Sequence, residues 1–166
     1  LIGAALLLLA LGSSDRIPTG DAPHLLAITG KLTAMLRHGE FLDFFEAWAS
    51  LVTPHPPAGY LVPLAFSILG FGSATPILTG LFGLALAWHG MVLLVHREPD
   101  GAVIPWLGGL LMFSSAIIWG AVEHMVWDLF AAGCVSGCVG HLHASDGFRN
   151  KGHAMFFGIF MGLGFV

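Results

Sequence analysis

The sequence has very few charged residues, and this scarcity decides its broad class. Charged residues make up 10% of the 166 positions, against roughly 25% in a typical soluble domain. Hydrophobic residues reach 56%, and the mean hydropathy is +0.84. A chain of this composition is predicted to be an all-α membrane protein, a polytopic bundle of transmembrane helices.

Basic residues and cysteines are scarce as well. Lysine and arginine together number 6, and the net charge is −4, which is too little positive charge for a protein that binds nucleic acid. The two cysteines, Cys134 and Cys138, lie four positions apart in an apolar run. That spacing is neither a disulfide framework nor a CxxC motif, so we expect them to be small packing residues.

The chain divides by polarity into three parts within one transmembrane domain. Residues 1–12 are predicted to be a truncated first helix, because their apolar run starts without a methionine or a basic flank. Residues 13–57 hold most of the acidic side chains and form a first outer loop. Residues 58–166 carry further membrane helices, and the whole is expected to be the amino-terminal part of a longer protein. Those helices are expected at 74–95, 102–122, 126–143 and 152–166.

Two short amphipathic helices are predicted within the outer loop, joined at Gly39. Apolar residues recur at helical spacing from Leu25 to Leu36, and again from Phe41 to Val52, with polar residues between them. Helices of this kind lie in the interface plane of a membrane. The alternative is that they pack on neighbouring helices.

Residues 58–70 leave two topologies open. Thirteen residues rise about 20 Å as a helix, less than the ~30 Å apolar core of a bilayer. If this segment does not cross, Arg97, Arg149 and Lys151 all face the cytoplasm, as basic loop residues prefer; if it crosses, Arg97 moves outside. We favour the first arrangement, which gathers six ionisable residues on one non-cytoplasmic surface. These are Asp21, His24, His55, Glu123, His124 and Asp128.

Three of these polar positions have both a structural and a chemical interpretation. His55 lies in TPHPPAGY, where the prolines hold the backbone extended and can simply open the next helix. Asp21 in GDAPH stands where a helix N-cap belongs, with Pro23 behind it. Its carboxylate could equally take a proton from a hydroxyl or bind a cation. Asp128 begins an apolar helix and could likewise be a cap.

The nine histidines allow two further interpretations. His89 and His96 lie seven positions apart on one predicted helix, which could suit haem ligation or a proton path, but no second spaced pair faces them. A metal site near the cytoplasm is the other interpretation, although its ligands lack a recognised spacing. Those ligands would be His141, His143, Asp146 and His153. Gly158 and Gly162 form a Gly-x-x-x-Gly pair, which is typical of close helix packing.

The order of these parts resembles the GT-C membrane glycosyltransferases, in the branch of protein mannosyltransferases and lipid A aminoarabinose transferases. Four segments carry the resemblance: GDAPH with Asp21, HPPAGY from His55 to Tyr60, VWDLFAAG with Asp128, and the glycine-rich residues 158–164. The resemblance covers nearly all 166 residues, and only the amino-terminal part of a typical member.

This resemblance implies an inverting transfer of a sugar from a polyprenyl-phosphate carrier to an acceptor on the non-cytoplasmic side of the membrane. Asp21 would be the catalytic base, and four other residues would bind the substrates. These are His24, His55, Tyr60 and Asp128. A divalent cation at Asp21 and Asp128 is the cofactor that the resemblance allows. The expected partners are the lipid-linked sugar, the bilayer and other membrane proteins, and the expected location is a cell membrane such as the bacterial inner membrane.

Two other classes of protein stay open. A non-enzymatic scaffold subunit of a larger membrane complex could share a glycosyltransferase-like fold, and a haem-linked or proton-linked membrane subunit is the third candidate. The outer loop also departs from the family, because its only basic side chains are Arg16, Lys31 and Arg37. Phosphate binding would therefore depend on histidines, on a divalent cation or on residues beyond Val166.

Overall fold

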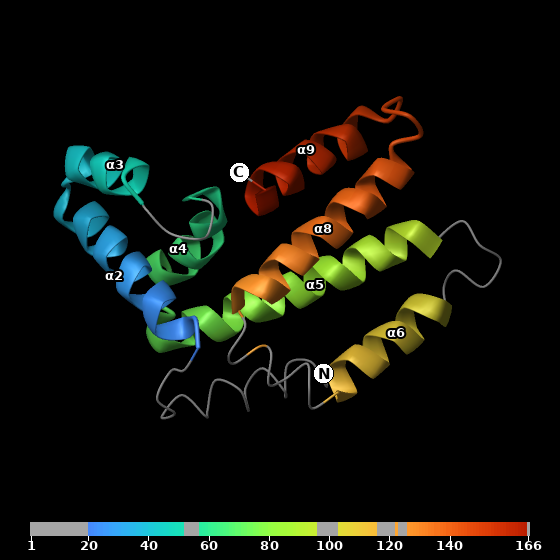
Figure 1. Ribbon diagram of the computed structural model, residues 1–166, viewed down its shortest axis with the longest axis horizontal. Helices are drawn as coiled ribbons and strands as arrows, with labels where there is room; N and C mark the ends of the chain where they lie inside the picture. Colours follow the sequence, from blue (N-terminus) through green and yellow to red (C-terminus); the bar gives the residue numbers. More distant parts are fainter. Residues whose placement is uncertain (1–19, 52–56, 96–102, 116–121, 123–125, 166) are drawn as a thin grey trace.

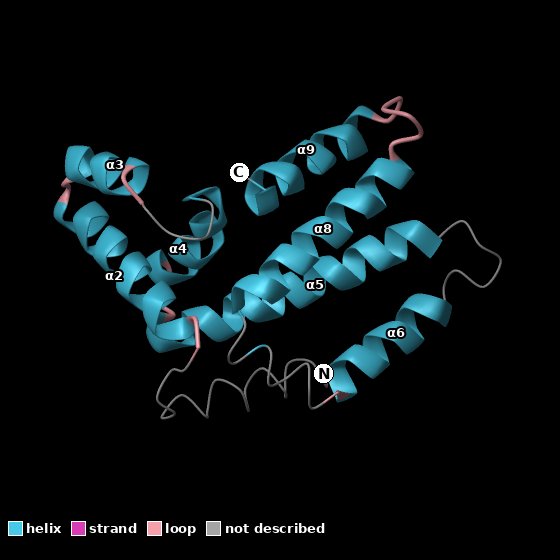
Figure 2. Cartoon of the chain, in the orientation of Figure 1, coloured by secondary structure: helices cyan, strands magenta, loops and turns pink. Residues whose placement is uncertain are grey.

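A computed structural model describes residues 20–51, 57–95, 103–115, 122 and 126–165 of the chain. Within these residues every regular element is a helix and no strand occurs (Figures 1 and 2). The predicted all-α fold is therefore confirmed, while the predicted helix at 1–12 lies outside the described residues. One described helical segment, Gly72–Val95, is long and apolar enough to cross a membrane, with 24 residues.

The described elements follow one another in a simple order. The segment predicted to be the outer loop contains α2 (Ala22–His38) and α3 (Phe41–Ala49). The short helices η1 (Pro57–Tyr60), α4 (Leu61–Ile68) and η2 (Gly72–Ala74) follow. Four longer elements complete the chain: α5 (Thr75–Val95), α6 (Val103–Ser114), α8 (Val126–Ala144) and α9 (Lys151–Phe165). The helices predicted at 74–95, 126–143 and 152–166 are thus confirmed to within a residue or so. Of the helix predicted at 102–122, α6 confirms the first part, and residues 116–121 lie outside the described residues.

Helix α2 begins and ends where the sequence places it, whereas α3 ends at Ala49, before the predicted limit near Val52. Pro23 lies in the first turn of α2. The N–H groups of a first turn have no partner within the helix, so the missing N–H of proline costs no hydrogen bond there. The helix ends at Gly39, whose φ of +76° is the left-handed conformation that closes many helices. The two predicted helices and their joint at Gly39 are therefore confirmed.

Helix α2 packs against α4, which runs alongside it. The hydroxyl of Thr33 donates a hydrogen bond to Oγ of Ser67 at 2.9 Å, and Leu32 is buried against Leu64. The sequence left open whether α2 lies in the membrane interface or packs on a neighbouring helix. The structure shows that α2 packs on a neighbouring helix. The eight residues of α4 rise only about 12 Å, so this helix does not reach across a bilayer core.

Helix α3 has apolar residues on both of its faces. Phe44 and Trp48 point toward α2 and α4, and their ring centroids are 5.8 Å apart. The other face leaves Phe41, Leu42 and Phe45 exposed, with Leu42 85% exposed. An uncovered apolar face is what an interfacial helix needs, and the interfacial position of α3 stays a prediction.

The centre of the molecule is a parallel pair of helices, α5 and α8 (Figure 1). Their backbones meet at glycines: a Cβ built on Gly133 would lie 2.2 Å from the carbonyl oxygen of Gly83. A Cβ on Gly140 would lie 2.7 Å from the carbonyl oxygen of Gly90. Because the contact repeats after seven residues on both helices, α5 and α8 stay side by side over two turns.

The glycine pair that the sequence offers for close packing does not make such a contact. Gly158 and Gly162 lie on α9, and a Cβ built on either one would meet no atom within 4 Å among the described residues. The prediction of close packing at this pair is therefore wrong for the described fold. Spacing alone does not show which face of a helix a neighbour will cover.

Candidate functional site

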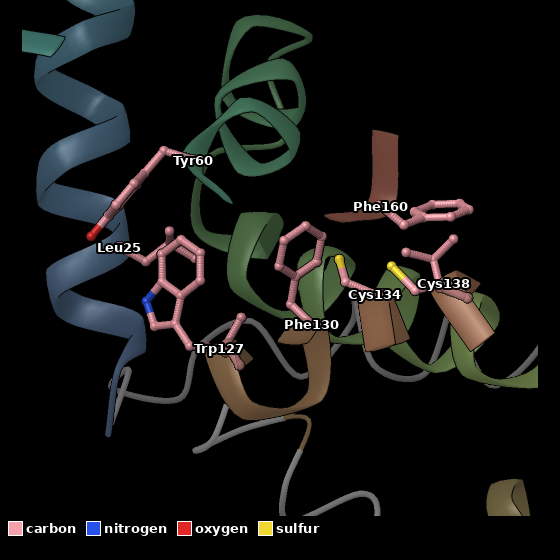
Figure 3. Close-up of a cluster of buried hydrophobic side chains, with 9 residues drawn as sticks. Leu25, Tyr60, Trp127, Phe130, Cys134, Cys138 and Phe160 are labelled. Carbon is pink, nitrogen blue, oxygen red and sulfur yellow. The ribbon is translucent and has the colours of Figure 1, made fainter. Parts of the chain in front are cut away.

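Three segments that are far apart in the sequence meet at one buried group, which we call the junction cluster. It consists of Leu25 from α2, Tyr60 from η1 and Trp127 from α8 (Figure 3). The rings of Tyr60 and Trp127 meet edge to face, with centroids 4.6 Å apart. All three side chains are buried. The junction cluster therefore brings together the residue that follows GDAPH, the tyrosine that ends HPPAGY and the tryptophan of VWDLFAAG.

Asp21 lies one turn before the junction cluster, at the N-cap of α2. Its carbonyl oxygen accepts the N–H of Leu25 at 3.0 Å, which begins the helix. A capping aspartate normally also accepts a backbone N–H with its side chain, but the carboxylate of Asp21 makes no such bond. The N-cap position is thus confirmed for the backbone, while the side chain of the half-buried Asp21 makes no capping hydrogen bond.

Asp128 follows Trp127 directly and is exposed in the first turn of α8. A negative charge is favourable there because the helix dipole is positive at this end. Since Leu25 and Trp127 belong to one cluster, the acidic ends of α2 and α8 lie on the same side of the molecule. Asp21 therefore precedes Leu25 by one turn and Asp128 directly follows Trp127, while their joint role in one site stays a prediction.

The other predicted site residues are placed less favourably or lie outside the description. His24 is exposed on the first turn of α2. The ring of Tyr60 is fully buried, so its visible contribution is packing in the junction cluster. His55 lies outside the described residues. Among the residues that are described, no three His, Cys, Asp or Glu side chains are grouped to hold a metal ion, and the cation at Asp21 and Asp128 stays a prediction.

A second polar site, which sequence analysis missed, lies between α5, α8 and α9. We call it the histidine chain: His89, His141 and His153. The Nε2 atoms of His89 and His141 are 3.3 Å apart, and the Nδ1 atoms of His141 and His153 are 2.8 Å apart. His141 is therefore in hydrogen-bonding contact through both of its ring nitrogens.

The central ring of the histidine chain is also the most enclosed one. His141 is 4% exposed, and the rings of Phe156 and Phe160 from α9 stack on it with centroids 5.1 and 5.5 Å away. His89 is exposed on α5, and His153 is half-buried. The chain thus runs from an exposed ring through a buried ring to a partly exposed one.

The turn between α8 and α9 fixes the position of His153. Oγ of Ser145 donates to the carbonyl of Leu142 at 2.7 Å and accepts the N–H of Phe148 at 3.2 Å. Oδ1 of Asn150 then caps α9 by accepting the N–H of His153 at 3.4 Å. These local bonds hold the start of α9 beside the end of α8.

The four-residue metal site expected near this turn does not form. His141 and His153 do meet, but His143 is exposed, and Asp146 is instead 3.9 Å from the guanidinium of Arg149. That prediction is wrong because neighbours on a helix need not share a face, and His141 and His143 are two residues apart. His96, the other half of the His89 pair, lies outside the described residues.

One signal in the sequence could have revealed the histidine chain. His89 precedes Gly90, and His141 follows Gly140, so each of these two histidines adjoins a glycine. Glycines seven apart occur on both α5 and α8, which is the spacing of two helices packed side by side. Matching those glycines would have placed the two histidines together.

Comparisons of this chain with protein families, with curated proteins and with solved structures find no match.

Proposed function

We propose that this chain is the amino-terminal part of a polytopic membrane glycosyltransferase of the GT-C type, which takes its sugar from a polyprenyl-phosphate carrier. The observation that carries the proposal is that the carboxylate of Asp21 makes no capping bond, although Asp21 lies one turn before Leu25 of the junction cluster. A second acid, Asp128, directly follows Trp127 of the same cluster. A carboxylate at a helix start that is not used as a cap can accept a proton from a hydroxyl.

The chemistry follows from these groups. The carboxylate of Asp21 takes the proton from the acceptor hydroxyl while its oxygen attacks the anomeric carbon of the sugar. The bond from that carbon to the phosphate oxygen breaks, and the polyprenyl phosphate leaves with the electron pair. Donors such as His24 and, as the resemblance implies, His55, or a divalent cation, would stabilise the departing phosphate.

The exposed surface supports a membrane location with several crossings. Helix α5 is long and apolar enough to span, and α6 leaves most of its large apolar side chains uncovered. The exposed ones on α6 are Val103, Ile104, Trp106, Leu107, Leu110 and Leu111. Apolar area of this extent is rare on water-soluble monomers, whereas lipid tails would cover it.

A sugar-transfer assay tests the proposal. Membranes that contain the intact gene product are supplied with a polyprenyl-phosphate-linked sugar labelled in the sugar, and the release of free polyprenyl phosphate is followed. We expect release that depends on the protein. Absence of both transfer and binding of the carrier, with the protein intact in the membrane, would favour the scaffold subunit instead.

The topology provides a separate prediction. Helix α3 and the turn between α8 and α9 lie toward opposite ends of the molecule (Figure 1). Ser50 directly follows α3, and Phe148 belongs to that turn. Both side chains are exposed, whereas Ser145 in the same turn is buried and would be a poor probe.

In the proposed arrangement the two probes are on opposite sides of the membrane. Ser50→Cys should react with an impermeant maleimide from outside, and Phe148→Cys should react only after the membrane is opened. The buried Cys134 and Cys138 serve as the unlabelled background. Labelling of both probes from one side would refute the arrangement that places the acidic ends of α2 and α8 outside the cytoplasm.

A further inference from the structure

We propose that the histidine chain is a proton-operated switch, which holds α9 against α5 and α8 and opens when the three rings take up a second proton. The chain joins three helices through two nitrogen-to-nitrogen contacts of 3.3 and 2.8 Å. This inference goes beyond the proposed function, because it concerns how three helices are held together and not what reaction the protein performs.

Counting protons shows why the second added proton opens the switch. Each contact between two ring nitrogens has room for one hydrogen, which one ring donates and the other accepts. The two contacts can therefore hold two hydrogens at most, and the outer nitrogens, Nδ1 of His89 and Nε2 of His153, can hold one each. Three neutral rings carry three hydrogens, so the closed chain has room for one more. Four hydrogens on three rings correspond to one positive charge. A second charge needs a fifth hydrogen, which must enter a contact that already holds one.

The single charge that the closed chain tolerates can be placed in different ways. An added proton on His153 leaves its other nitrogen donating to His141, and an added proton on His89 simply reverses the direction of both bonds. Either placement keeps the two contacts intact. With two charges, a contact has a hydrogen on both sides, and the like charges repel at short range in a partly buried site.

The surroundings offer no competing partner for these rings among the described residues. From α5 the only titratable group facing His141 is His89, and from α9 it is His153. The aromatic rings of Phe156 and Phe160 stack on His141. Asp146 and Arg149 in the exposed turn are paired with each other. The buried ring of His141 therefore depends on His89 and His153 for its hydrogen bonds.

A movement of the start of α9 would also move the residues in its later turns. The apolar side of α9 continues to the junction cluster, where Phe157, Phe160 and Leu163 pack into the same core as Tyr60. A movement of α9 away from α8 would thus reach the η1 segment. Since the open state binds more protons than the closed one, a fall in pH favours opening.

A distance measurement between α8 and α9 tests the switch. Spin labels are placed at Val139→Cys and Met155→Cys, two exposed positions, in a protein whose Cys134 and Cys138 are replaced by alanine. At about pH 7.5 we expect a single short distance. Near pH 5, where ordinary histidines are charged, a longer distance should become the main population and should revert when the pH is raised.

Two matched substitutions identify the groups responsible. His141→Gln keeps a neutral hydrogen-bonding side chain at the centre and should hold one distance at both pH values. His143→Gln removes an exposed histidine from the same helix and should leave the pH response unchanged. A single distance in the parent protein at both pH values, or loss of the response in His143→Gln alone, would overturn the proposal.

Wild-type protein provides a test that does not depend on the variants folding. With ¹⁵N-labelled histidine, the spectrum at about pH 7.5 should show nitrogen-to-nitrogen couplings across two hydrogen bonds, and these should vanish near pH 5. If the spectra showed no coupling between the nitrogens of different rings at either pH value, the histidine chain would be refuted. A stoichiometric zinc or copper ion in the purified protein that His141→Gln lacks would also refute it, because the rings would then be metal ligands.

Discussion

Replacing Asp21 with asparagine should leave the fold intact and lower the rate of sugar transfer by about 10²–10⁴-fold, the usual contribution of a general base. Asparagine has nearly the size of aspartate and caps helices about as well, so α2 should still begin at Ala22. It cannot take a proton from an acceptor hydroxyl. The measurement is the transfer rate of the purified intact protein at saturating carrier, together with its melting temperature.

Two further substitutions separate the catalytic role from a structural one. Because the carboxylate makes no capping bond, Asp21→Ala should destabilise the protein by less than the ~1 kcal/mol of a typical lost cap. Asp43→Asn makes the same chemical change at an exposed position in the first turn of α3 and should keep the wild-type rate. Wild-type transfer by Asp21→Asn would remove this residue from the catalytic assignment.

Replacing Gly133 with alanine should destabilise the protein by about 3 kcal/mol or more, the upper range for overpacking. The new methyl group would lie 2.2 Å from the carbonyl oxygen of Gly83, and its three nearest atoms are all backbone atoms of Gly83, which cannot turn aside as a side chain can. Only a separation of α5 from α8 relieves this clash, and separation would also pull His89 away from His141. Thermal unfolding in detergent measures the loss.

The control is the same substitution where space is open. Gly158→Ala on α9 meets no atom within 4 Å among the described residues and replaces a poor helix former with a good one. It should be neutral or stabilising by up to about 1 kcal/mol. Equal melting temperatures for Gly133→Ala and the wild type would contradict the close packing of α5 and α8.

The helices themselves could be predicted because their signals are local. Apolar runs bounded by glycine, proline and charged turns gave the limits of α5, α8 and α9, and the pair of short helices around Gly39. The N-cap position of Asp21 followed from Pro23 in the same way. In each case the residues that decide the structure are within a few positions of one another.

The pairing of helices could not be predicted in this way. Nearly all side chains of α8 are apolar or small on every face of the helix, so the periodicity of apolar residues does not mark one face as the buried one. The histidine chain depends on that pairing, since His89 and His141 are 52 positions apart. The sequence also could not predict that the carboxylate of Asp21 makes no capping bond. It shows which residue stands at the N-cap position, but not whether the side chain of that residue bonds to the backbone.

The parallel arrangement of α5 and α8 has a consequence for the order of folding. Gly83 and Gly133 are 50 positions apart, and two parallel helices cannot pair until the chain between them has been made. At 5–20 residues per second, synthesis of that stretch takes about 2.5–10 s. Throughout this interval the face of α5 that carries Gly83 and Gly90 lacks its partner α8 and is open to other molecules. A ribosome-bound chain ending just after α6 would present this face to whatever assists its insertion.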